Sequence, residues 1–272
     1  MEQMALEGDK VTVVQACKWS GMARRSYYYQ TKQSKPKLND VLVQRIKRFI
    51  DAFPYAGYRT VAALLGLNKN TVQRIFQLKG WQVRKRKSGM RPRAQAMPSV
   101  STRPDERWST DMARVWCGPQ ARWACLTLVM DCHTRELLGW RLSRQGNAKA
   151  AEATLEEALI NRFGCLVPLK EPLKLRSDNG LVFSSRRYTQ TVYRYGIEQE
   201  FIKPHTPQQN GMVERLIRTV KEQCIHLHSF NSIEQARETL SKWFKFYNEQ
   251  RPHQALKMKT PKQAYELHQQ VA

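Results

Sequence analysis

The fold is decided by residues 107–142, which read RWSTDMARVWCGPQARWACLTLVMDCHTRELLGWRL. Apolar, β-branched and aromatic residues form three runs in this stretch, and a Gly-Pro pair and several polar residues separate them. Such a pattern is typical of short strands joined by turns. We therefore predict three strands in succession, over 107–115, 122–131 and 137–142.

Downstream of these strands, helical and strand patterns alternate. Residues 148–163 carry apolar residues at helical spacing, and a further helix is expected near 187–195. Two more strands are predicted over 173–177 and 197–202. Three strands followed by alternating helices and strands predict a mixed α/β sheet flanked by helices, and not a doubly wound sheet.

The chain after Asn210 is predicted to be a helical C-terminal segment. Two stripes of apolar residues recur there at helical spacing. They comprise Val213, Leu216, Ile217, Val220 and Cys224, and then Ala236, Leu240, Trp243, Phe244 and Tyr247.

The chain before the sheet is also predicted to be helical. Residues 11–30 indicate two short helices around a turn at Ser20-Gly21, which suits a helix-turn-helix and a simple helical hairpin equally well. Residues 38–81 indicate three helices, the third of them capped by Asn68. That third helix carries Lys69 and Arg74. Its basic character, within a strongly basic segment, favours a small DNA-binding module, whereas its apolar positions alone indicate only a core.

A basic tract with helix-breaking Gly and Pro follows this module. Such tracts usually follow phosphates without reading sequence, and the alternative is a solvated linker that contacts nothing. Its cations are Arg84, Lys85, Arg86, Lys87, Arg91 and Arg93. We accordingly divide the chain into a helix-turn-helix-like segment (1–37), a helical DNA-binding module (38–83), a basic linker (84–104) and a mixed α/β part with a helical C-terminal extension (105–272).

The charge of the chain favours a polyanionic partner. Its 272 residues include 46 Lys or Arg and 23 Asp or Glu, a formal net charge of +23. Residues 1–104 carry +16 of this surplus and residues 105–272 carry +7. Nucleic acid is the default partner for such a balance, and the N-terminal part is expected to grip it.

The sequence supports neither a membrane protein nor a zinc-finger protein. We find no secretory signal, no apolar stretch of about eighteen residues and no basic amphipathic helix with bulky apolar cover. The six cysteines form no C-x-x-C pair, so reduced thiols in the cytoplasm are the simplest assignment. Cys224, His226 and His228 lie close together, but no second half-site follows at a spacing that suits zinc.

Three acids are the candidate catalytic residues. Asp111 in RWSTDMA and Asp178 in KLRSDNG lie where strands should end or turn, and Asp178 is expected at an edge of the sheet. Glu214 lies near the start of a helix, after a loop with two prolines. At helical spacing, Arg218 and Lys221 share the face of Glu214. A carboxylate beside two cations suits a metal ligand next to groups that hold DNA phosphates.

Other conspicuous residues receive structural interpretations. Asp131 is expected to be a turn residue, with Arg135 as its possible partner, and Glu198 and Glu200 are expected to face solvent on an edge strand. His205 suits a DNA contact and a plain loop residue equally well. Trp108 and Trp140 are expected in the core.

The motifs RWSTDM, KLRSDNG and HTPQQNGMVERLIRTVK resemble those of the DDE transposase and retroviral integrase superfamily. The closer resemblance is to the second-reading-frame product, OrfB, of the insertion-sequence-three family. YNEQRPHQALKMKTPKQAY (247–265) adds strongly to it, and YAGYRTVAALL (55–65) is similar to that family's upstream helical module.

This resemblance implies an RNase H-like catalytic core in which Asp111, Asp178 and Glu214 bind two Mg²⁺ ions, which Mn²⁺ can replace. Asp111 would bridge the ions, Asp178 would hold one and Glu214 the other. Water would first cut a transposon end, and the exposed 3′ hydroxyl would then attack target DNA. Lys221 and Arg218 would position DNA near the scissile phosphate.

The resemblance also implies the partners of the chain. These are the terminal inverted repeats and target DNA, further copies of the chain on that DNA, and an upstream-frame OrfA product or an OrfA-OrfB fusion, in a bacterial cytoplasm at the nucleoid. Two alternatives stay open from the sequence. One is a non-catalytic repressor or domesticated relic, and the other is a structure-specific nuclease of the same fold.

Overall fold

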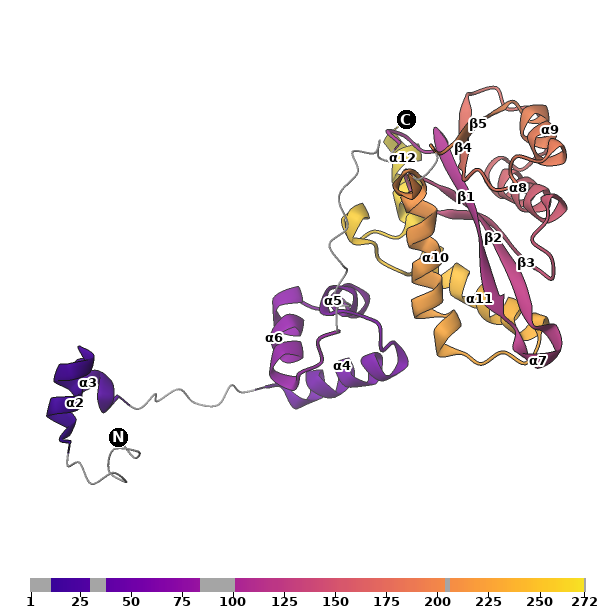
Figure 1. The fold of residues 1–272 in the computed structure, drawn as a ribbon. Helices are drawn as coiled ribbons and strands as arrows, with labels where there is room; N and C mark the ends of the chain where they lie inside the picture. The colour runs from indigo at the N-terminus through magenta and orange to yellow at the C-terminus, as the bar shows by residue number, and fades with distance from the viewer. Residues whose placement is uncertain (1–10, 30–37, 84–100, 204–205, 272) are drawn as a thin grey trace. The chain divides into compact units, whose positions relative to one another are not determined.

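The computed structural model describes residues 11–29, 38–83, 101–203 and 206–271 (Figure 1). The chain divides into two compact units, Met1–Val43 and Gln44–Ala272, and each is described by itself. Several predicted DNA contacts lie outside the described residues, as does His205. They are Arg84, Lys85, Arg86, Lys87, Arg91 and Arg93.

The first unit contains the two short helices predicted around the Ser20-Gly21 turn. Helix α2 (Val13–Ser20) begins with a reciprocal capping box between Thr12 and Gln15. Gly21 ends it in the left-handed conformation, with φ of 67°, which glycine adopts without steric cost. Helix α3 (Arg24–Tyr27) follows.

Helices α4 (Asp40–Ala52), α5 (Tyr58–Leu65) and α6 (Lys69–Lys79) match the three predicted upstream helices. The Asn68 side chain accepts a hydrogen bond from the Asn70 amide, as expected of an N-cap. Each helix buries apolar residues, namely Ile46 on α4, Val61 on α5, and Val72, Ile75 and Phe76 on α6. Lys69 and Arg74 are exposed on α6 and therefore available to a partner.

The sheet has five strands in the order β3-β2-β1-β4-β5. Strands β1, β2 and β3 are antiparallel neighbours, whereas β4 runs parallel to both β1 and β5. The predicted mixed sheet is thereby confirmed (Figure 1). The strands are β1 (Arg107–Trp116), β2 (Trp123–Asp131), β3 (Leu137–Ser143), β4 (Leu173–Ser177) and β5 (Ile197–Phe201). A four-residue helix, α7 (Gly118–Ala121), lies in the β1–β2 connection, where only a turn was expected.

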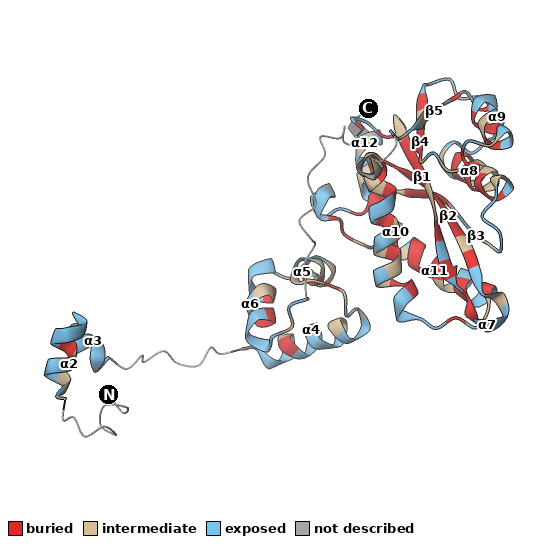
Figure 2. Cartoon of the chain, viewed as in Figure 1, coloured by how far each residue is buried: buried red, intermediate tan, exposed pale blue. Residues whose placement is uncertain are grey.

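Helices cover both faces of this sheet (Figures 1 and 2). Helices α8 (Ala148–Phe163) and α9 (Arg186–Arg194) supply one hydrophobic cluster, which includes Trp108 of β1. Helices α10 (Gly211–Gln223) and α11 (Ile233–Glu249) supply the other, which includes Val115 of β1. Both predicted C-terminal stripes lie in this second cluster. The last helix is α12 (Pro261–Val271).

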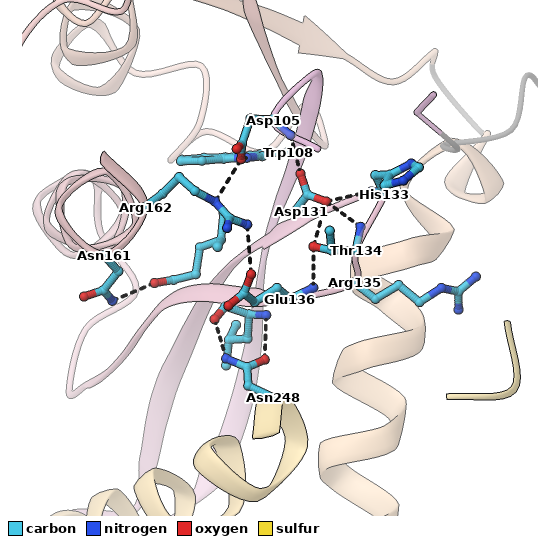
Figure 3. A network of polar contacts seen from close by, with 12 residues as sticks. Asp105, Trp108, Asp131, His133, Thr134, Arg135, Glu136, Asn161, Arg162 and Asn248 are labelled. Atoms are coloured by element: carbon cyan, nitrogen blue, oxygen red, sulfur yellow. Dashed lines mark hydrogen bonds and ion pairs between the residues drawn. The ribbon is translucent and has the colours of Figure 1, made fainter. Parts of the chain in front are cut away.

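A buried polar network holds the β2–β3 turn against α8 and the C-terminal part (Figure 3). The Arg162 side chain, 3% exposed, forms ion pairs with Asp105 at 3.0 Å and Glu136 at 2.9 Å, although the N–H vectors are not aligned for good hydrogen bonds. Its guanidinium also lies 3.7 Å from the ring centroid of Tyr265 on α12. This arginine therefore joins three separate parts of the chain.

Asp131 is a structural turn residue, as predicted. Its carboxylate accepts hydrogen bonds from the amides of Asp105, His133 and Thr134 and from the Thr134 hydroxyl. The proposed pairing with Arg135 was wrong, because the Arg135 side chain points away from this carboxylate (Figure 3). The amides of the turn satisfy Asp131 instead.

Glu200 does not simply face solvent, so that expectation was wrong. Its carboxylate accepts hydrogen bonds from Nε of Arg107 at 3.0 Å and Nε of Arg176 at 2.8 Å. Partial burial by itself would raise the pKa of Glu200. The hydrogen bonds and positive charges of Arg176 and Arg107 outweigh this effect, so the pKa of Glu200 lies below its ordinary value. Glu198 is exposed on β5, as predicted, 3.7 Å from Lys174.

The remaining structural interpretations can be checked directly. Trp108 is fully buried, and Trp140 packs on Phe244 with ring centroids 5.0 Å apart. All six cysteines are free thiols. None of the helices within the described ranges is long and apolar enough to cross a membrane.

Candidate active site

Asp111 is half-buried in the middle of β1. Side chains alternate between the faces of a strand, so Asp111 shares the face of Val115, which is covered by α10 and α11. Its Oδ1 accepts a hydrogen bond of 2.7 Å from the Met112 amide. The strand therefore directs this carboxylate to the side of the sheet on which Glu214 lies.

Asp178 follows the last residue of β4. The parallel register pairs Trp108 with Leu175 and Ser109 with Arg176. Continued by two residues, the same register sets Asp178 alongside Asp111. The sequence analysis placed Asp178 at an edge of the sheet. Strand β4 instead lies between β1 and β5, so Asp178 is at the carboxyl end of an interior strand.

The turn after β4 shapes the position of the Asp178 carboxylate. Its Oδ1 accepts a hydrogen bond of 3.0 Å from the Gly180 amide. A Cβ atom on Gly180 would lie 2.9 Å from this Oδ1, closer than real Cβ contacts. A larger residue at position 180 would therefore displace the Asp178 carboxylate from its place against the backbone. The Asn179 side chain ties the turn to the Ile202 carbonyl at 2.8 Å.

Glu214 lies in the first turn of α10 and is exposed. Val213, Leu216 and Val220 anchor the helix in the core and leave Glu214 on the flank it shares with Arg218 and Lys221. Its pKa is raised, because partial burial outweighs the nearby charge of Arg218.

Asn210, which immediately precedes α10, ties this helix to β1. Its side-chain amide donates a hydrogen bond of 3.2 Å to the carbonyl of Thr110, the residue before Asp111, and both residues are buried. The sequence analysis assigned no role to Asn210. A polar residue just before a helix usually suggests a local cap, but here the side chain makes no cap bond.

Arg176 is a second residue that the sequence analysis missed. This buried arginine on β4 donates from Nη1 to the Gln209 carbonyl at 2.8 Å and from Nε to Glu200. It therefore fixes the loop before α10 to the end of the strand that leads to Asp178. A charged residue two positions before a candidate acid was the available sequence signal.

The three acids form one electrostatic neighbourhood. The pKa of Asp111 is raised from 3.8 to about 6, first because the carboxylate is buried, and further because Asp178 and Glu214 lie near it. The Met112 amide and the charge of Lys221 act in the opposite direction. The charges of Asp178, Glu214 and Lys221, all distant from Asp111 in sequence, thus act on the Asp111 carboxylate.

These carboxylates are not arranged as a complete metal-binding site. Across the described parts of the chain, no group of three or more His, Cys, Asp and Glu residues is arranged to hold a metal ion. The donor set itself is suited to a hard divalent cation, because half-buried carboxylates that repel one another are stabilised by such a charge.

Comparisons with known proteins agree with this arrangement. Two family models, both described as an integrase core domain, match residues 101–207 and 195–261. Together they span all five strands and helices α8 to α11, including the positions of the three acids.

Curated relatives cover most of the chain. The insertion element IS407 uncharacterized 31.7 kDa protein of Burkholderia multivorans is 29% identical over 266 residues, which are 94% of this chain and 91% of that protein. The putative transposase InsK for insertion sequence element IS150 of Escherichia coli is 29% identical over 255 residues, 88% of each chain.

One solved structure supports the fold. A chain of the simian T-cell lymphotropic virus intasome, solved in complex with the PP2A regulatory subunit B56 gamma, matches with a TM-score of 0.52 at 14% identity. The match covers 81% of this chain and 74% of that chain. It agrees with the predicted RNase H-like sheet, and at this identity it concerns the fold alone.

Proposed function

We infer that this chain, which belongs to the insertion-sequence-three family of DDE transposases, cuts DNA at the ends of its element and joins the exposed 3′ ends to target DNA. The observation that carries the proposal is the meeting of Asp111 and Asp178 on adjacent parallel strands, with Glu214 on the helix tied to the first of them. Three acids from three elements thus share one neighbourhood.

Asp111, Asp178 and Glu214 would hold Mg²⁺, with Mn²⁺ as a substitute of the same ligand preference. When bound, the metal supplies Lewis-acid stabilisation of the charge that develops on the phosphodiester oxygens. The raised pKa of Asp111 supports this assignment, because the repulsion behind part of the shift disappears when a cation joins the cluster.

The other residues of the site position DNA and the acids. Lys221 and Arg218 lie on the flank of α10 that carries Glu214, where their charges suit a phosphate next to the scissile bond. Asn210 and Arg176 hold the start of α10 against β1 and β4. Lys69 and Arg74, exposed on α6, suit contacts to the DNA backbone farther away.

The partners follow from the reaction. The substrates would be double-stranded terminal repeats and target DNA, and two ends are joined most simply by two or more copies of the chain. We also propose that an upstream-frame OrfA product, separate or fused, contributes recognition of the ends. The protein would work at its DNA, on the bacterial nucleoid.

The decisive experiment is a strand-transfer assay with pre-cut, end-labelled terminal repeats, supercoiled target plasmid and Mg²⁺. Joined products are the expected result. Cutting of uncut ends without joining of pre-cut ends would instead indicate a structure-specific nuclease. Binding without either reaction would favour a repressor or a domesticated relic.

A further inference from the structure

The flank of α10 that carries Arg215 and Thr219 borders an open cavity of about 620 Å³. The β2–β3 turn, the end of α11, the segment that follows it and Arg59 and Thr60 of α5 complete its lining. Arg215 lies next to Glu214 in sequence and one helical turn from Arg218 on the exposed side of α10. The cavity is thus a neighbour of the acid cluster on the same helix, and none of the three acids lines it.

Arg251 is held in this cavity by neutral partners. Its Nε donates to Gln223 Oε1 at 2.9 Å, and its Nη1 donates to His253 Nε2 at 3.3 Å. Its guanidinium also lies 5.8 Å from the ring centroid of Tyr247. Burial lowers the pKa of Arg251, which shows that its charge is partly removed from water.

Three further arginines line the same cavity, and one of them, Arg59 of α5, lies 4.6 Å from the ring centroid of Tyr58. Arg135 comes from the β2–β3 turn, where its φ is 61°, and its side chain points away from the acids of the Arg162 network (Figure 3). Arg215 is exposed on α10. The charges of Arg251 and Arg135 both act on His253 and, with its burial, lower its pKa to about 3.

These cations have no compensating acids. Within the described residues, none of Arg135, Arg215 and Arg251 forms an ion pair with a carboxylate. Glu222 is the single acid among the residues that line the cavity. A partly buried cation without a partner is costly, whereas an anion placed between several guanidinium groups gains charge-assisted hydrogen bonds.

We propose that Arg135, Arg215 and Arg251 bind a backbone phosphate of DNA at this cavity beside α10. This inference rests on the proposed function, since it assumes that DNA lies across α10 at the acids. The bound phosphate would be a neighbour of the phosphate at the acids, because Arg215 and Glu214 are adjacent residues of one helix.

The site also gives a role to the sequence YNEQRPHQAL. Tyr247, Arg251 and His253 of this segment act together, because His253 accepts from Arg251 and packs edge-on against Tyr247 with ring centroids 4.8 Å apart. The Tyr247 hydroxyl in turn donates to the Arg135 carbonyl at 3.2 Å. The segment thus positions two of the three arginines.

The test measures binding of a fluorescein-labelled 30-base-pair duplex of random sequence by anisotropy, in EDTA and over a series of KCl concentrations. The variants are Arg135→Gln and Arg215→Gln, with Arg251→Lys and Arg251→Gln as a further pair. Arg186→Gln is the matched control, because it removes the same charge from an exposed position on α9. Thermal unfolding of each variant verifies that it is folded.

We expect Arg135→Gln and Arg215→Gln each to weaken binding several-fold and to reduce the salt dependence of log Kd by at most about 0.9, the contribution of the one phosphate that the three arginines share. Arg251→Lys should keep more affinity than Arg251→Gln. Variants Arg135→Gln and Arg215→Gln that behave like Arg186→Gln would overturn the proposal. Because these measurements contain no metal and no reaction, failure of the wild-type protein to join DNA ends would contradict only the proposed function.

Discussion

The side-chain amide of Asn210 donates a hydrogen bond to the main-chain carbonyl of Thr110, 100 positions earlier in the chain, across 3.2 Å. Thr110 precedes Asp111, and Asn210 precedes the helix that carries Glu214. A single buried contact therefore couples the positions of two of the three acids. The predictions below begin with this contact.

Asn210→Ala should reduce strand transfer by about 10- to 100-fold with little change in DNA binding, because small displacements of catalytic groups carry rate losses of this size. The loss of the hydrogen bond should lower the free energy of unfolding by about 1–2 kcal/mol. Asn161→Ala is the matched control, because it removes a bond of the same kind, from Asn161 Nδ2 to the Leu138 carbonyl at 2.8 Å, on α8, which packs on the other face of the sheet from α10. Equal activity in the two variants would show that Asn210 does not position the acids.

Asp178→Asn and Glu214→Gln should each abolish cleavage and joining in Mg²⁺, because each removes an anionic ligand for a divalent cation. DNA binding, measured by gel shift in EDTA, should change little. Glu198→Gln is the control, because it neutralises an exposed acid on β5 that lies outside the cluster. Normal joining by either active-site variant would remove that residue from the proposed triad.

Arg162→Met should lower the free energy of unfolding by about 3 kcal/mol, because it leaves two half-buried carboxylates without their shared cation. Urea unfolding at neutral pH measures this loss. Lys242→Met provides the comparison, since it breaks an exposed pair with Glu238 and should change stability by less than about 1 kcal/mol. Similar losses in both variants would mean that the Arg162 network contributes no more than a surface pair.

His253→Gln should make stability less dependent on pH below neutrality. The pKa of His253 is lowered from 6.5 to about 3 by burial and by Arg251 and Arg135, so the folded state keeps this ring neutral while the unfolded chain protonates it. The unfolded state then binds more protons as pH falls from about 6.5 towards 3, and stability decreases by up to about 1.4 kcal/mol per pH unit.

Urea unfolding between pH 7 and pH 4.5 checks this expectation. The wild-type protein and His226→Gln, which changes an exposed histidine, should lose stability in parallel, and His253→Gln should show a shallower decline. Parallel behaviour of all three proteins would contradict the buried, neutral state of His253.

The kinds of elements and their order could be predicted from the sequence. The five strands, the helices between them and the two apolar stripes after Asn210 all follow from periodicity, and the structure contains each of them. Two errors concerned single residues: Asp111 lies within β1 and not at the end of a strand, and Asp131 does not pair with Arg135. Two others concerned Glu200, which pairs with two arginines, and the placement of Asp178 at an edge. These last two depend on strand order, which local periodicity does not encode.

The sequence by itself singled out the residues that we propose to carry the chemistry: three acids, their neighbouring cations and a strongly basic N-terminal part. Only the tertiary structure decided that Asp178 lies alongside Asp111, that Asn210 holds Thr110, and that Arg251 shares a cavity with Arg135. The physical reason is the separation along the chain between the residues that interact. Helix and strand patterns arise from neighbours a few residues apart, whereas these pairings depend on strand register and helix packing across the whole domain, which no short window of sequence contains.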